Sequence, residues 1–147
     1  MALNPNQIPI YAITPRTAVG ILNAATAGSL GSNTNGVTIH TAGANGGRVY
    51  SLMMNTDDTA AVNVFLYLYD GSNVKPLGLV NVPLSSGNVA GANAVNALNQ
   101  TSMPGLPIDN LGKPYIEMAA NEVLKMACLA NMTAAKKLYA TAQGADY

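Results

Sequence analysis

The chain has 147 residues, with seven Lys and Arg balanced by seven Asp and Glu, so its formal net charge is zero. Charged residues make up only 10% of the sequence and hydrophobic residues 49%, whereas ordinary soluble domains carry about 25% charged residues. This balance offers no basic stripe for phosphates and argues against direct nucleic-acid binding. No apolar run approaches the length of a membrane span. So little charge predicts a surface of uncharged polar residues, much of it buried against partners.

The first 16 residues, "MALNPNQIPIYAITPR", predict an extended arm. Pro5, Pro9 and Pro15 disfavour helix, and no turn brings the segment back. An alternative is that "IPIYAI" forms the first strand of the domain itself. The segment lacks the positive start and the sustained apolar core of a signal peptide. Its candidate assembly contacts are Ile8, Ile10 and Tyr11.

Residues 17–147 predict a β domain. Short strands are expected at "TAVGILN" and "GVTIHTA", separated by the low-complexity segment 23–36. Longer strands are expected at 46–55 and 60–70, which are rich in β-branched and aromatic residues. Because only a short polar turn lies between these two strands, we expect them to form an antiparallel hairpin.

The strand at 60–70 is apolar on both faces. Val62, Val64, Leu66 and Leu68 alternate with Phe65, Tyr67 and Tyr69, and alternate residues of a strand point to opposite faces of the sheet. The strand is therefore expected to be central or to lie under another body. We predict that the second face is a subunit contact made by Phe65, Tyr67 and Tyr69.

The turn at 70–73 leads into "VKPLGLVNVPL", where Pro76 and Pro83 indicate an edge strand or a bulge. A long segment then follows at 85–112, built mainly of Ala, Asn, Gly, Ser and Val. Loops of this length are usually functional or disordered. The spacing of Ala92, Val95 and Leu98 permits a short helix. Val95 and Leu98 complete the candidate assembly contacts.

Three more strands are expected near the C-terminus, at 113–120, 123–130 and 136–143. The last of them is expected to pair with 123–130 through a short turn and to lie inside a sheet. Many short strands with turns between them, and almost no helical periodicity, predict one antiparallel all-β sandwich or jelly roll with an extended arm and long loops.

The sequence contains little that indicates chemistry. His40 is expected to be a surface or half-buried strand residue, and Cys128 a small buried apolar one. One His and one Cys exclude a His/Cys zinc site within the chain. Asp57 and Asp58 are better explained by a turn that needs their side chains than by a cation site shared with Asp70. We therefore predict a protein that is not an enzyme and binds no metal or cofactor.

The C-terminal third carries a resemblance to a known class. "KPYIEMAANEVLKMACLANMTAAKKLYATAQGADY", with the hairpin "VNVFLYLYDGSNVKPLGLVNVP" upstream, resembles capsid cement or decoration proteins of tailed bacteriophages. The resemblance covers roughly residues 46–147. It implies a jelly-roll or sandwich protein on the outer capsid surface of the virion, present in the host cytoplasm during assembly. Its implied partners are further copies of itself, as a dimer or trimer, and the major capsid protein.

An alternative function is left open. A β-sandwich of a phage tail or adhesin could recognise carbohydrate or another feature of the host surface. Sugar sites generally need exposed aromatic side chains, and Tyr67 and Tyr69 are the candidates for that role. The mass measured by size-exclusion chromatography and a glycan-binding screen would separate the two alternatives.

Overall fold

The computed structural model describes residues 14–23, 36–130 and 132–147. The arm residues Ile8, Ile10 and Tyr11 lie outside the described residues, as does most of the predicted loop at 23–36. Residues 14–16, which we assigned to the arm, belong to the first strand. No helix of the described residues is long and apolar enough to cross a membrane.

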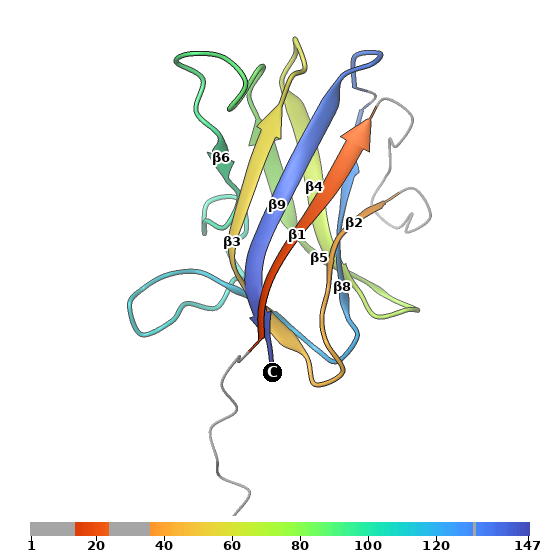
Figure 1. Ribbon diagram of the computed structural model, residues 1–147, viewed down its shortest axis with the longest axis vertical. Coiled ribbons are helices and arrows are strands. Elements are labelled where there is room, and N and C mark those ends of the chain that lie inside the picture. Colours follow the sequence, from red (N-terminus) through yellow and green to blue (C-terminus); the bar gives the residue numbers. More distant parts are fainter. Residues whose placement is uncertain (1–13, 24–35, 131) are drawn as a thin grey trace, which may run out of the picture.

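Two antiparallel sheets form the body (Figure 1). The first sheet has the order β1-β9-β3-β6, with β7 also paired to β3; the second has the order β2-β8-β4-β5. The first sheet contains β1 (Thr14–Asn23), β9 (Lys137–Asp146), β3 (Gly47–Thr56), β6 (Val95–Asn96) and β7 (Ile116–Met118). The second contains β2 (Val37–Thr41), β8 (Val123–Cys128), β4 (Val62–Tyr69) and β5 (Val74–Val82).

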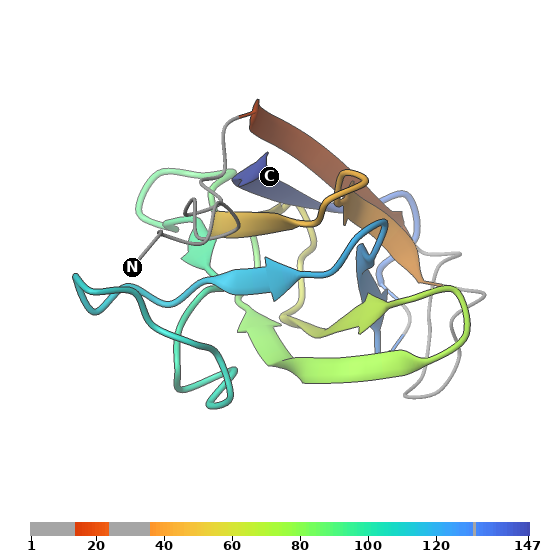
Figure 2. The ribbon, with the colours of Figure 1, turned by 90° about the horizontal axis from the view of Figure 1, so that it is seen from below.

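The chain passes repeatedly between the two sheets, as in a jelly roll. Figure 2, turned by 90°, places β1 and the C-terminus on one side of the body and the hairpin that leads into β5 on the other. The prediction of an all-β antiparallel sandwich or jelly roll is confirmed.

The core lies between the sheets and follows the strand alternation. In β4 the inward residues Val64 and Leu66 are fully buried and pack against Leu52 of β3 and Leu124 of β8 in one cluster. A large core of this kind stabilises by about 25 cal/mol for each Å² of apolar surface removed from water. Strand β4 is central, between β8 and β5, as its two apolar faces predicted.

Two predicted strand pairings are wrong. Strands β3 and β4 are not a hairpin, since the turn after β3 carries the chain into the other sheet. Strand β9 does not pair with β8 but lies between β1 and β3. Both of its edges are thus paired within the chain, so β9 lies inside a sheet, as expected.

The predictions around β5 are confirmed. It pairs with β4 through the turn at 70–73, it lies at an edge of the second sheet, and the register shifts opposite Pro76. Beyond it, residues 92–98 contain the short strand β6 and no helix. Their spacing therefore indicated a helix that the structure does not form, because Val95 pairs with Met54 instead.

Candidate functional site

The most distinctive surface of the molecule is the outer face of the first sheet. Side chains that are paired across neighbouring strands point to the same side of a sheet. In the registers of β1 with β9 and of β9 with β3, the outward positions toward the Asn23 end of β1 are Thr17, Val19, Ile21, Asn23, Lys137, Tyr139, Thr141, Gln143, Ser51, Met53 and Asn55. We call these residues the outer face; Lys137 is the one charged side chain among them. The same alternation continues at the other end to Pro15, Ala145 and Arg48, and Arg48 is paired there with Glu117.

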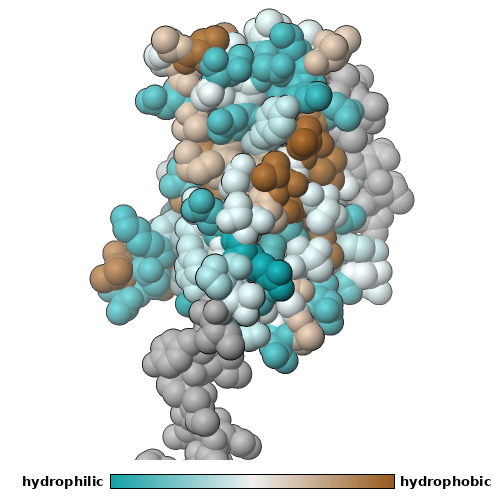
Figure 3. Space-filling view, in the orientation of Figure 1, coloured by the Kyte–Doolittle hydropathy of each residue, from teal (hydrophilic) through white to brown (hydrophobic). Residues whose placement is uncertain are grey.

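The outer face has an apolar centre. Val19 is 51% exposed and Ile21 is 43% exposed, and Ile21 is the partner of Tyr139 across the strands. Figure 3 shows this side of the molecule, with apolar brown groups over β1, pale surface beside them and hydrophilic teal groups above and below. Single exposed apolar residues are ordinary, but adjacent ones on a flat, nearly uncharged sheet are typical of an interaction surface.

The inward side of β1 explains how this strand is held. Ala18, Gly20 and Leu22 face the second sheet, and a Cβ added to Gly20 would lie 2.9 Å from the carbonyl oxygen of Thr38. Because Gly20 has no side chain, β1 can approach β2 closely at the corner of the sandwich. The same alternation leaves Val19 and Ile21 on the outside.

A buried polar cluster holds the chain end against β1. Arg16 Nε donates a hydrogen bond to Asp146 Oδ2 at 2.6 Å, and His40 Nε2 lies 3.7 Å from Asp146 Oδ1. Burial raises the pKa of Asp146, but hydrogen bonds from Arg16 and from the Gly43 N–H outweigh burial and hold it below its ordinary value. Burial lowers the pKa of His40, so its imidazole is neutral at neutral pH.

This cluster corrects the prediction for His40, which is 6% exposed rather than at the surface. It also attaches the C-terminal end of β9 to β1 and to the segment after β2. Tyr147 extends the tie, because its N–H donates to the carbonyl of Gly46 and its hydroxyl donates to Glu117. Burial, together with this hydrogen bond, raises the pKa of Tyr147 to about 12.

The paired aspartates have structural roles. The carboxylate of Asp58 accepts hydrogen bonds from the N–H and hydroxyl of Thr133 and from the N–H of Ala60. Burial raises its pKa, but these bonds outweigh burial and lower it. Asp57 accepts from the N–H of Lys137. Among the described residues no group of three His, Cys, Asp or Glu could hold a metal ion.

The predicted contact residues are mostly inside the molecule. Phe65 is 4% exposed and Tyr67 1% exposed, stacked on each other beside the buried Ala127. Tyr69 is half-buried, and its hydroxyl donates to the carbonyl of Gly71. Their face of β4 is thus covered, as expected, but the first two residues offer little area to a partner. The subunit contact itself stays a prediction.

The two contacts predicted in the long segment also lie close to the core. Val95 is half-buried and packs against the main core cluster, and Leu98 is 3% exposed within it. Sequence reasoning missed the outer face that the structure reveals instead. The signal was the alternation of Val19 and Ile21 with Gly20 and Leu22, but the sequence does not indicate which of the two sets faces inward.

Neither a protein-family model nor a curated protein sequence matches this chain. Among solved structures, it is similar to a chain of the "Cyanophage Pam1 capsid asymmetric unit", with 16% sequence identity over 99% of both chains and a TM-score of 0.45. A TM-score below 0.5 carries no argument about the fold or the function of this protein.

Proposed function

We propose that this protein is a virion structural protein of a tailed bacteriophage, a cement or decoration protein that binds the outer capsid surface and stabilises contacts between capsomers. The observation that carries the proposal is the outer face, broad, apolar at its centre and nearly without charge. Charged residues are depleted at the centre of protein interfaces, whereas a freely soluble surface needs them. We assign no catalytic step and no cofactor to the chain.

The size of the outer face indicates how it is used. Three strands spaced about 4.8 Å apart, the longer two contributing seven residues each at about 3.3 Å, give a patch of roughly 14 Å by 23 Å. That is roughly 300–400 Å², less than the ~800 Å² per partner of a stable interface. The outer face is therefore the centre of a larger contact, and residues 1–13 are proposed to supply the remainder.

The fold alone does not decide between the two functions that the sequence left open, because jelly rolls occur in viral capsid proteins and in lectins alike. The surface favours assembly. Tyr67, which was a candidate sugar platform, is buried, and Tyr69 has its hydroxyl engaged and Lys125 over its ring. We further propose that the protein associates with itself as a dimer or trimer on the capsid.

Binding to capsid shells tests the proposal. Shells assembled from the major capsid protein encoded in the same genome are mixed with wild-type protein and sedimented. The variant Val19→Lys/Ile21→Lys places two charges on the outer face, and their burial under a partner would cost free energy of desolvation. Both positions are exposed enough to leave the fold intact. The matched control is Leu79→Lys, since Leu79 is 44% exposed on β5, which belongs to the second sheet.

We expect wild type and the Leu79→Lys control to co-sediment with the shells and the double variant to bind at least about tenfold more weakly, which corresponds to about 1.4 kcal/mol. Wild type that stays in the supernatant would overturn the cement role. Equal binding by the double variant would show that another surface makes the contact.

A further inference from the structure

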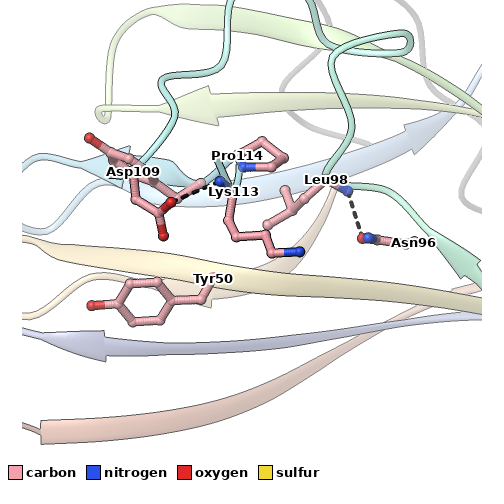
Figure 4. A pocket seen from close by; sticks show the side chains of 7 residues that line it. Tyr50, Asn96, Leu98, Asp109, Lys113 and Pro114 are labelled. Carbon is pink, nitrogen blue, oxygen red and sulfur yellow. Dashed lines mark hydrogen bonds between the residues drawn. The ribbon is translucent and has the colours of Figure 1, made fainter. Parts of the chain in front are cut away.

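A cavity of about 210 Å³ opens beside the outer face, next to β3. It lies between β3, the short strand β6 and the hairpin loop around 108–114 (Figure 4). Its lining residues are Tyr50, Asn96, Leu98, Asp109, Lys113, Pro114 and Tyr115.

The position of Tyr50 results from a β-bulge. The register of β3 with β9 shifts between Val49 and Ser51, so Tyr50 is the extra residue that has no partner position on β9. Bulges of this kind redirect a side chain and are frequent beside functional sites. The Tyr50 side chain is 50% exposed and forms one wall of the cavity.

The second aromatic wall is held rigidly. The guanidinium carbon of Arg48 lies 4.0 Å from the centre of the Tyr115 ring, and Arg48 donates from Nε to Glu117 Oε2 at 2.8 Å. Tyr115 lines the cavity, whereas Arg48 does not. The cavity thus has one exposed tyrosine and one fixed tyrosine, and neither is buried in the core.

Three polar side chains complete the lining. Asp109 Oδ1 accepts hydrogen bonds from the N–H groups of Leu111 and Lys113, which fixes its carboxylate in the loop. Figure 4 shows that carboxylate on the same side of the cavity as the Tyr50 ring, while the Lys113 side chain extends toward Leu98 and Asn96. Asn96 Oδ1 accepts from the Leu98 N–H, which leaves its amide N–H groups to donate elsewhere.

We propose that this cavity binds a single pyranose ring of a carbohydrate. The tyrosine rings can pack against the apolar C–H face of a sugar. The Asp109 carboxylate can accept hydrogen bonds from sugar hydroxyls, and Asn96 and Lys113 can donate to them. A small apolar cavity with a few converging polar groups is the usual form of a small-ligand site.

Size and charge select this class of ligand. The cavity is below the roughly 300–1,000 Å³ of sites for drug-sized molecules, so it fits one ring rather than a nucleotide or a long chain. Its one cation, Lys113, shares the lining with the anion Asp109, which disfavours phosphate and favours a neutral polyol. The site is independent of the proposed capsid contact, because none of its lining residues belongs to the outer face.

Saturation-transfer NMR on the full-length protein tests the site. The probes are D-glucose, D-galactose, D-mannose and N-acetyl-D-glucosamine, each at millimolar concentration, because a ligand of this size is expected to bind in that range. The variants are Tyr50→Ser, which removes the exposed wall, and Asp109→Asn, whose amide oxygen can still accept the two loop N–H groups. The matched control is Tyr139→Ser, which removes an exposed tyrosine from the outer face.

We expect at least one of the four sugars to receive saturation from wild type and from the Tyr139→Ser control. Tyr50→Ser should weaken that binding at least about tenfold, and Asp109→Asn should weaken it by a smaller factor, with unchanged thermal melting in both. No transfer to any of the four sugars overturns the proposal. Equal binding by Tyr50→Ser does so as well, since it would place the sugar elsewhere. Neither result bears on capsid binding.

Discussion

The tie between the chain end and β1 makes a measurable prediction. In Asp146→Ala the carboxylate disappears from a site where it is 4% exposed, and the groups that donated to it lose their acceptor. His40 then remains buried next to a void. We therefore expect the variant to fold but to be clearly less stable, because the C-terminal end of β9 loses its attachment to β1 and to the segment after β2.

The magnitude follows from the two donors. A hydrogen bond from a backbone N–H to a buried charged group contributes about 1.5–3 kcal/mol. The Arg16 side chain is 53% exposed, so its ion pair is screened by water and adds only about 0–1 kcal/mol. Together these give about 2–4 kcal/mol, which for a chain of this length lowers the melting temperature by roughly 4–16 °C.

Thermal melts followed by circular dichroism at neutral pH, with urea unfolding alongside, measure this effect. Asp146→Asn should fall between wild type and Asp146→Ala, since an amide keeps the shape and one acceptor. The matched control is Glu117→Gln at the same end of the sheet. Its amide oxygen can still accept from the Tyr147 hydroxyl, the side chains of the lost Arg48–Glu117 ion pair are 29% and 46% exposed, and we expect a loss of about 1 kcal/mol or less. An Asp146→Ala protein that melts with wild type, or no lower than the control, would refute the reasoning.

Three further predictions follow from the buried groups and from the arm. Because the pKa of His40 is lowered in the folded protein, its contribution to the stability of the fold is complete above its ordinary pKa of 6.5 and is lost progressively below it. The lowered pKa values of Asp58 and Asp146 add a second loss of stability below their ordinary 3.8. Melting temperatures measured between about pH 8 and pH 3 should show both declines. The Tyr67 hydroxyl has no hydrogen-bond partner among the described residues, so Tyr67→Phe should match or exceed wild-type stability in urea, whereas Tyr67→Ala should cost about 3–5 kcal/mol. Deleting residues 2–13 should leave the melting temperature nearly unchanged and weaken sedimentation with capsid shells; if the truncated protein unfolds, the segment is part of the core.

The sequence predicted the strands well where the determining interactions are local. The turn that joins β4 and β5 is fixed by its own residues, because Asp70 Oδ1 accepts from the N–H groups of Ser72 and Asn73. The alternation in β4 likewise predicted which side chains face the core. These features depend on neighbours in the chain, and a single sequence contains that information.

The strand partners could not be predicted in the same way, because they depend on distant residues. The turn after β3 resembles a hairpin turn, yet Asp58 is fixed by Thr133, and the chain continues into the other sheet. The outer face could not be predicted from the sequence for a related reason. Val19 and Ile21 alternate with small and apolar residues, so their outward direction is decided only when Gly20 meets β2. The contacts of Asp146 with His40 and Arg16 likewise join the two ends of the chain.

The central position of β9 has a consequence for the order in which the protein forms. The first sheet is assembled around β9, which follows the other described strands along the chain, and Arg16 and Asp146 are 130 residues apart. Strand β1 therefore waits without its ladder partner among the described strands while about 120 further residues are synthesised, a delay of roughly 6–24 s at about 5–20 residues per second. During that interval its apolar residues are open to chaperones and to other nascent chains. Folding is then expected to be slow, as for other proteins dominated by pairings between distant strands.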